Sequence, residues 1–497
     1  MPRSLSPGLA GATSVVIALW LVSASGQDPA PPSELAHPLR LTRETVVARL
    51  QALREHRPHV PGEAIVKFRA GAGARAQTLA LRSLRGGGQV ASAPMGNLRL
   101  VRAPEEPNAE LMAEMLRRQP EVEWAEPNYV LRLHSAPNDT SYVRQWNMDA
   151  IQMPSAWDIN PGGSSSVTVA VLDSGIVTAT RSFPFSLWRG AGFASVTIPF
   201  AQNPDLSASR VTKAMDFAFW DGPVLDMVGH GTHVAGTILQ ETNNGLGLAG
   251  IAYHTNLMPL KVCIGYWEIQ IVQAALNIPG YVDPDSGGCF LSELVDAIRY
   301  AADNGAHVIN MSLGGPEQSI ALRDAIRYAV GKGTFVAMSA GNGFETGNAV
   351  EYPSGYGPEI DGAMSVAAVG RSLSRAYYSS TGSQVEIAAP GGDVRAGGLP
   401  GTIYQVGLFD SDFTPSPSTT PRFDRYYDKP LQGTSMAAPH VAGVAALLYS
   451  QGVRNPAAIE AALKKFAEDL GPQGRDDQYG YGLVDARAAL RGLGAAR

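Results

Sequence analysis

Runs of apolar residues in the second half of the chain predict buried strands of a parallel sheet. Val167-Thr-Val-Ala-Val-Leu172 is the clearest of them, and residues 308–311 and 333–340 have a similar character. Strands that are covered on both faces show such continuous apolar runs instead of a strict alternation. A longer stretch rich in Ala, Val and Leu, residues 437–448, predicts a buried helix. This pattern favours an α/β fold.

The segment before this region has a different texture. Residues 27–58 are rich in Pro and then in Arg. Strand and helix signals then alternate, with a helix at 42–54, strands at 61–68 and 97–102, a helix at 108–118 and a strand at 122–130. This content predicts a small α+β domain ahead of the larger α/β domain.

The first 26 residues have the pattern of a secretory signal peptide. The positively charged start Met1-Pro-Arg3 precedes an apolar stretch from Ala12 to Ala24, which ends in small residues of the kind found at a cleavage site. An uncleaved membrane anchor is the alternative, but the apolar stretch is short for a span. A net charge of −6 and the lack of a long basic run argue against a nucleic-acid partner. We therefore expect an exported protein, extracellular or held in the periplasm of a Gram-negative cell, with no stable membrane association.

A serine at the start of the predicted helix is the first candidate for chemistry. Gly433-Thr-Ser-Met-Ala-Ala-Pro-His440 places Ser435 between a flexible turn and the helix. Unpaired N–H groups and the positive end of the dipole favour a developing negative charge at such a helix N-terminus. Taken alone, the same serine would be read as a helix cap.

Two upstream residues could serve as its partners. Asp173 follows strand 167–172 directly, at the carboxyl end where binding crevices form in α/β sheets, although an isolated Asp-Ser-Gly is more often a turn. His230 lies in Gly229-His-Gly-Thr-His-Val-Ala-Gly-Thr237, with a helix expected from Thr232. A metal site at His230 and His233 is disfavoured because the glutamate of the zinc-protease motif is missing. We expect His233 to pack or hydrogen-bond inside the fold.

The three motifs together carry a family resemblance. Val-Leu-Asp-Ser-Gly, His-Gly-Thr-His-Val-Ala-Gly-Thr and Gly-Thr-Ser-Met-Ala-Ala-Pro-His-Val-Ala-Gly occur in the order Asp, His, Ser, as in subtilisin. The chain resembles the subtilases, the subtilisin-like serine proteases. The resemblance implies a three-layer helix/parallel sheet/helix catalytic domain. It also implies a serine endopeptidase in which Asp173 orients His230, and His230 takes the proton of Ser435 as the acyl-enzyme forms.

The resemblance also implies an oxyanion donor and a substrate-binding segment. Asn342, in Gly-Asn-Gly after strand 333–340, resembles the family's oxyanion asparagine, although alone it would be read as a turn. The backbone of a nearby segment resembles the part of the family that pairs with an extended peptide substrate: Ser312, Leu313 and Gly314. The primary pocket is expected to involve residues 352–355. No acidic cluster can be placed at its base, so an apolar preference is expected.

Calcium is the expected cofactor, and no organic cofactor is expected. Thr242-Asn-Asn-Gly-Leu-Gly-Leu-Ala-Gly250 resembles the family's calcium loop, and Asn203-Pro-Asp-Leu206 resembles the segment that donates a carboxylate. Asp205 and Asn244 are the two side-chain candidates, whereas calcium takes six to eight oxygen ligands. A glycine-rich turn without metal is the alternative, because only these two ligands can be named. The loop is also one residue longer than its counterpart in subtilisin, which leaves its register open.

The region before the catalytic domain resembles the family's inhibitory propeptide. Residues 27–134, with an inhibitor-like unit at about 59–134, would form the propeptide, and residues 135–497 the peptidase domain. The resemblance implies a zymogen whose propeptide assists folding and acts as an intramolecular inhibitor. Processing is expected between about Leu133 and Asn138.

Insertions and a cysteine pair distinguish this chain from a minimal subtilase. Three segments look longer than a minimal subtilase would need: residues 180–200, 264–290 and 396–430. The Pro/Ser/Thr-rich run 414–421 in the last of them is expected to be a mobile surface loop. Cys263 and Cys289 suggest a disulfide in an exported protein, worth roughly 3 kcal/mol. A free buried pair remains the alternative, because the sequence does not supply the distance between the two residues.

The leading hypothesis is a secreted, calcium-assisted serine endopeptidase that is made as an autoprocessed zymogen and acts as a monomer on protein or peptide substrates in extended conformation. The alternative from another class is a pseudoenzyme that binds extended peptides without cutting them. Loss of a triad residue would favour that alternative, and none is lost here. A third hypothesis is that the propeptide stays bound to the peptidase domain as a lasting inhibitor.

Overall fold

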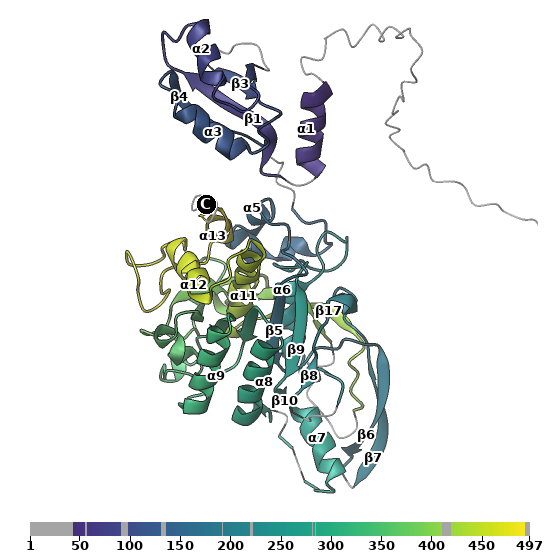
Figure 1. Ribbon diagram of the computed structural model, residues 1–497. Helices are drawn as coiled ribbons and strands as arrows, with labels where there is room; N and C mark the ends of the chain where they lie inside the picture. The colour runs from purple at the N-terminus through teal and green to yellow at the C-terminus, as the bar shows by residue number, and fades with distance from the viewer. Residues whose placement is uncertain are drawn as a thin grey trace, which may run out of the picture. The chain divides into compact units, whose positions relative to one another are not determined.

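The computed structural model describes residues 43–54, 57–90, 98–130, 136–190, 192–218, 222–280, 282–283, 285–409 and 419–492 (Figure 1). The chain forms two compact units that divide between Leu131 and Arg132. The predicted signal peptide lies outside the described residues, as does most of the run 414–421.

The N-terminal unit is a small α+β domain, as the sequence predicts. Its elements are α1 (Arg43–Arg54), β1 (His59–Phe68), α2 (Ala74–Leu81), β2 (Gln89–Val90), β3 (Leu98–Arg102), α3 (Ala109–Arg117) and β4 (Val122–Tyr129). The strands form an antiparallel sheet in the order β2-β3-β1-β4. Helix α3 begins after Asn108, whose side chain accepts hydrogen bonds from the backbone N–H groups of Glu110 and Leu111. The helix buries Met112 and Leu116 in the core of this domain.

A seven-stranded sheet, in the order β15-β14-β13-β12-β5-β9-β8, organises the second unit. Its strands are β5 (Thr168–Asp173), β8 (Met215–Asp216), β9 (Asn256–Lys261), β12 (Val308–Met311), β13 (Phe335–Ser339), β14 (Ala363–Val369) and β15 (Ile387–Pro390). Every neighbouring pair of these strands is parallel. Their carboxyl ends therefore lie along one edge of the sheet, where Asp173 closes β5.

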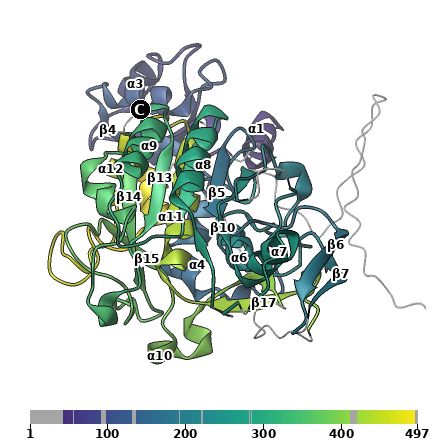
Figure 2. The ribbon, with the colours of Figure 1, turned by 90° about the horizontal axis from the view of Figure 1, so that it is seen from below.

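Helices cover both faces of this sheet in three layers, which Figure 2 shows with α8 and α9 on one face and α6 and α11 on the other. The main helices of this unit are α6 (His230–Leu239), α8 (Leu291–Asp303), α9 (Ile320–Gly331), α11 (Thr434–Ser450), α12 (Pro456–Lys465) and α13 (Ala486–Gly492). Strand β5 serves both cores, because Val169 and Val171 face α6 and α11 while Ala170 and Leu172 face α8 and α9. Although the run is continuously apolar, its side chains therefore alternate between the two faces of the sheet.

The remaining helices and three hairpins of the described residues complete the unit. The helices are α4 (Trp146–Ala150), α5 (Met153–Trp157), α7 (Tyr266–Ala275) and α10 (Val394–Gly397), with short 3-10 helices at Tyr142–Arg144, Ala208–Arg210, Phe344–Thr346, Ser354–Glu359 and Leu399–Gly401. Antiparallel hairpins are formed by β6 (Arg181–Trp188) with β7 (Phe193–Phe200), β10 (Cys263–Ile264) with β11 (Gly288–Cys289), and β16 (Ile403–Leu408) with β17 (Tyr426–Leu431).

The three predicted insertions supply these hairpins and α7. They share a separate apolar cluster in which the rings of Phe200 and Phe423 stack with centroids 5.2 Å apart. Figure 1 shows α7 beside the β6–β7 hairpin, in agreement with the direct contact of α7 with β6. In the part of the chain that the structure describes, no helix combines the length and apolar character needed to cross a membrane.

Candidate active site

Asp173 and His230 form a hydrogen-bonded pair at the carboxyl edge of the sheet. Asp173 ends β5, His230 begins α6, and Asp173 Oδ1 lies 2.8 Å from His230 Nδ1. The Asp173 side chain is 4% exposed and the imidazole 32% exposed. Burial lowers the pKa of His230, but the charge of Asp173, its hydrogen bond and the charge of Asp226 outweigh burial, so the net pKa of His230 is raised. The imidazole can therefore hold a proton while keeping an open face.

A fully buried carboxylate, Asp226, positions the helix that carries His230. Its Oδ1 accepts from Ser174 Oγ at 2.9 Å and from the N–H groups of Val228 and Gly229, and its Oδ2 accepts from the N–H and hydroxyl of Thr232. Helix α6 consequently begins at His230, two residues before the predicted start at Thr232. Asp226 is not among the site residues predicted from the sequence. Its signal was an acidic residue just ahead of a helix start.

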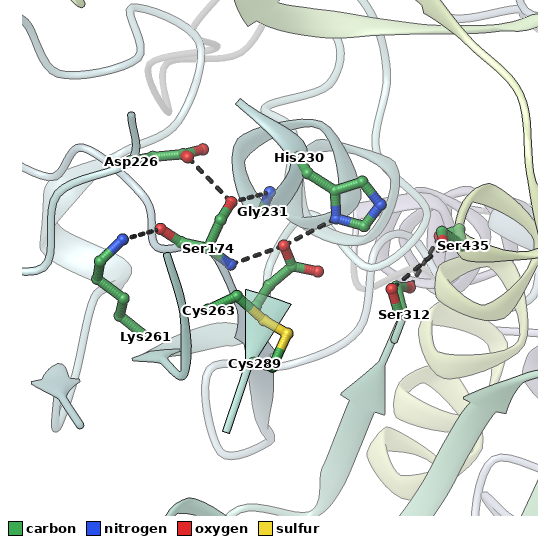
Figure 3. Close-up of a disulfide and its surroundings, with 10 residues drawn as sticks. Ser174, Asp226, His230, Gly231, Lys261, Cys263, Cys289, Ser312 and Ser435 are labelled. Atoms are coloured by element: carbon green, nitrogen blue, oxygen red, sulfur yellow. Dashed lines mark hydrogen bonds and ion pairs between the residues drawn. A yellow bond between two sulfur atoms is a disulfide. The ribbon is translucent and has the colours of Figure 1, made fainter. Parts of the chain in front are cut away.

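Ser174 links this cap to the catalytic strand. Its hydroxyl accepts from the N–H of Gly231 at 2.9 Å, and its own N–H donates to Asp173 Oδ1 at 2.7 Å. Figure 3 shows Ser174, Asp226 and Gly231 together on one side of His230, with Ser312 and Ser435 on the other. The strand end and the helix start are thereby fixed to each other.

Ser435 lies in the first turn of α11, after Gly433 at φ 147°. That backbone angle favours glycine. The Ser435 hydroxyl donates to the carbonyl oxygen of Ser312 at 3.1 Å, and Ser312 Oγ donates to the carbonyl oxygen of Ser435 at 2.8 Å. Among the described residues no hydrogen bond joins Ser435 to His230, so the hydroxyl points toward Ser312 in this conformation.

The side chain of Asn342 is oriented by Thr434. Asn342 Oδ1 accepts from the Thr434 N–H at 2.9 Å and from its hydroxyl at 3.0 Å. Because a backbone N–H can only donate, the amide oxygen must face Thr434, which leaves the NH₂ group as the donor available to another acceptor. Asn342 and Ser435 are thus tied to the same helix N-terminus.

The segment that contains Ser312, Leu313 and Gly314 runs from the end of β12 past Ser435. Ser312 is held by Asn310, whose amide donates to its hydroxyl at 3.0 Å, as well as by Ser435. Leu313 is half-buried and Gly314 is exposed. The next residue, Gly315, forms a two-way backbone pair with Tyr352.

Comparison with known proteins decides the family. The model of the subtilase family matches residues 164–482, and that of the fervidolysin N-terminal prodomain matches residues 46–128. This chain is a member of the subtilase family. It is a subtilisin-like serine protease with an N-terminal prodomain, and the predicted family and fold class are confirmed.

Several relatives of this subtilase are similar along most of its length. The thermophilic serine proteinase of Bacillus sp. (strain AK1) is 31% identical over 449 residues, 89% of this chain and 91% of that protein. Thermitase of Thermoactinomyces vulgaris is 31% identical over 71% of this chain and 99% of its own. The extracellular protease of Xanthomonas campestris is 31% identical over 79% of this chain and 63% of its own.

Solved structures show the same fold. A protease from Pseudoalteromonas arctica, 30% identical, has a TM-score of 0.53 over 72% of this chain and 99% of its own. Fervidolysin from Fervidobacterium pennivorans has a TM-score of 0.51 at 23% identity, over 88% of this subtilase and 61% of that chain, and supports the fold alone.

The other histidines near the site are buried and engaged by neighbouring polar groups. His233 Nε2 lies 3.2 Å from the carbonyl oxygens of Ile403 and Lys429, and burial with the charge of His230 lowers its pKa to about 3. His440 Nδ1 lies 2.8 Å from the Met436 carbonyl oxygen, and burial lowers its pKa to about 4. Both rings stay neutral near pH 7 and serve packing, as expected for His233.

The two calcium candidates of this subtilase lie together. Asn244 Nδ2 is 2.6 Å from Asp205 Oδ1, and Asp205 is 1% exposed. Burial raises the pKa of Asp205 to about 6, against hydrogen bonds from Asn244 and Gln240 that lower it. A third residue, Asp139, accepts from the N–H groups of Asn243 and Asn244. Asp139 is not among the residues predicted from the sequence, because it lies far from the loop along the chain.

A disulfide joins Cys263 to Cys289 across the β10–β11 pair, with the Cα atoms 4.0 Å apart (Figure 3). Two residues earlier, Lys261 donates to the carbonyl oxygen of Ser174 and forms an ion pair with Glu268 at 3.1 Å, both side chains being 2% exposed. The insertion at 264–290 is therefore anchored beside the strand end that carries Asp173.

Proposed function

We propose that this subtilase is a secreted endopeptidase that cuts peptide bonds through an acyl-enzyme on Ser435. The observation that carries the proposal is the 2.8 Å hydrogen bond between Asp173 and His230 Nδ1, at a histidine with an open face. With Nδ1–H donating to the carboxylate, Nε2 remains the acceptor, which is the tautomer that a general base needs.

The reaction would begin with rotation of the Ser435 hydroxyl from Ser312 toward His230. Nε2 takes its proton as Oγ bonds to the substrate carbonyl carbon, while the Asn342 amide and the Ser435 N–H donate to the oxyanion. Collapse breaks the C–N bond, and His230 protonates the leaving amine. A water molecule then attacks the acyl-enzyme by the same steps, which frees Ser435 and releases the carboxylic acid product.

Substrate would bind as an added strand. Ser312, the first residue of the Ser312–Gly314 segment, is hydrogen-bonded to Ser435, so an extended peptide paired with this segment would bring a carbonyl to the nucleophile. Main-chain pairing suits protein and peptide substrates of many sequences. The enzyme would act as a monomer.

The prodomain would be removed by the enzyme itself. We infer that it assists folding, occupies the active site as an intramolecular inhibitor and is cut between about Leu133 and Asn138, after export directed by residues 1–26. The extracellular Xanthomonas relative supports export.

We infer that structural calcium binds at the 242–250 loop. Asp139 and Asp205 are buried, 5% and 1% exposed, and among the described residues neither has an ion-pair partner. Calcium takes oxygen ligands, so these two carboxylates would hold it, and Asn244 would contribute its amide oxygen in place of the NH₂ group that donates to Asp205 in this conformation. When bound, calcium would neutralise this acidic cluster and stabilise the loop.

Intact mass and N-terminal sequencing of the secreted protein test the proposal. Wild type should lose the segment ahead of about residue 135 and Ser435→Ala should retain it, whereas Ser292→Ala, an exposed serine on α8, should process normally. Retention of the segment by all three proteins would favour a peptide-binding pseudoenzyme. Loss from all three would show that another protease does the cutting, and a peptide-hydrolysis assay of wild type against Ser435→Ala would then decide.

A further inference from the structure

A carboxylate lies against the proposed substrate-binding segment. Glu351 directly precedes Tyr352, which exchanges backbone hydrogen bonds of 2.7 and 2.9 Å with Gly315. An ideal β-carbon built on Gly314 would lie 3.2 Å from Glu351 Oε2. The Glu351 side chain therefore contacts the last residue of the Ser312–Gly314 segment.

The same carboxylate contacts the segment that carries Asn342. An ideal β-carbon on Gly341 would lie 2.5 Å from Glu351 Oε1, and one on Gly343 would lie 3.6 Å from it. The backbone N–H of Asn342 donates to the carboxylate. Glu351 thus lies between two glycine-bearing segments, one bonded to Ser435 through Ser312 and the other bonded to the neighbouring Thr434 through Asn342.

The charge of Glu351 is not neutralised by a neighbouring cation. Among the described residues, no Lys, Arg or His forms an ion pair with Glu351, and its side chain is half-buried. Burial raises the pKa of Glu351, and the hydrogen bond from Asn342 opposes that shift. A cation placed against this carboxylate would gain a charge-assisted hydrogen bond in a partly desolvated site.

We propose that Glu351 makes this enzyme prefer Lys or Arg as the residue that precedes the cut bond. The proposal rests on the proposed function. A substrate paired with Ser312–Gly314, with its carbonyl between Ser435 and Asn342, presents that side chain to the space between the two segments. The aliphatic stem would pack along the glycine backbones, and its charged end would meet the carboxylate.

This specificity differs from the apolar preference expected from the sequence. Glu351 lies 37 or more positions from the substrate-binding segment along the chain, and only the Gly315–Tyr352 pairing brings it there. The sequence predicts the primary pocket at the adjoining residues 352–355, but no local pattern marks Glu351 as its acidic residue.

Tetrapeptide p-nitroanilides that differ only in their last residue, Lys, Arg, Leu or Phe, test the proposal. Wild type should have a higher kcat/KM for Lys and Arg than for Leu and Phe. Glu351→Gln should lower kcat/KM for Lys and Arg about tenfold or more, with Leu and Phe changed less than about twofold. The control Glu359→Gln removes the same charge near Arg323 and Arg327 and should keep the wild-type ratio.

The results that would contradict the proposal can be distinguished from one another. An unchanged Lys-to-Phe ratio in Glu351→Gln, or an equal loss for all four peptides, would overturn the proposal, the latter because Glu351 would then only hold Asn342 in place. Mass spectrometry of a denatured protein digested by wild type needs no variant, and should show cuts mainly after Lys and Arg. If wild type cuts nothing and equals Ser435→Ala, the endopeptidase function itself fails, and this proposal with it.

Discussion

Replacing Asp226 by Asn tests how the histidine is positioned. Asp226 is 0% exposed and accepts five hydrogen bonds, three on Oδ1 and two on Oδ2. An asparagine keeps one acceptor oxygen. If that oxygen serves Val228 and Gly229, the new NH₂ group faces the N–H of Thr232, which is left without an acceptor.

The expected loss follows from these bonds. A buried donor without a partner costs about 1–3 kcal/mol, and the bonds that remain lose the extra strength that a charged acceptor provides. We expect Asp226→Asn to lower the free energy of unfolding by about 3 kcal/mol. Because the charge of Asp226 also raises the pKa of His230, the variant should move the acid limb of kcat/KM to lower pH.

Urea unfolding in a Ser435→Ala background measures the first effect without self-digestion, and a pH–rate profile of the active protein measures the second. Asp324→Asn, at an exposed position of α9, is the matched control. A free energy of unfolding of Asp226→Asn within about 0.5 kcal/mol of that of its parent would refute this expectation, because surface changes usually fall in that range. An acid limb that stays in place or moves to higher pH would equally contradict it.

Four further outcomes are expected. Asn342→Ala should lower kcat about 10²–10³-fold with little change in KM, as steady-state kinetics would show, and a rise in KM alone would remove Asn342 from the oxyanion site. His440 has a pKa of about 4 when buried but an ordinary one in the unfolded chain, so the unfolded state binds more protons between about pH 6.5 and 4 and stability falls as pH is lowered. The contribution of His440 should be about 3 kcal/mol, measured as the amount by which the loss of urea stability across that range is smaller in His440→Gln than in wild type. Chelation of calcium should lower the melting temperature of wild type but not of Asp205→Asn, and equal responses would argue against the ion. Replacing both Cys263 and Cys289 by Ser should cost about 3 kcal/mol, measured by the same urea titration, and no change would mean that the cross-link does not restrict the unfolded chain.

Local pattern was enough for the family, the buried strands and the main helices. The apolar run that forms β5 and the run inside α11 are both where the sequence predicts them, because strands and helices buried in a core must be apolar whatever their neighbours are. The three motifs also pointed to Asp173, His230 and Ser435 as a set. Their roles, and that of Asn342, stay predictions for the variants above.

Residues that act through long-range contacts were not predicted from the sequence. Asp139 meets the 242–250 loop only after the chain has folded, and Glu351 reaches Gly314 and Gly341 only through the pairing of Tyr352 with Gly315. Asp226 lies close to His230 in the chain, but its five donors come from two elements.

Motifs of adjacent residues therefore defined the fold family and the reaction class, because backbone geometry couples neighbours along the chain. The positions of Asp226 near His230, of Asp139 at the 242–250 loop and of Glu351 beside the proposed substrate-binding segment were decided by tertiary structure. Their effect depends on distance and on exclusion of water, and neither quantity is encoded in any short stretch of sequence.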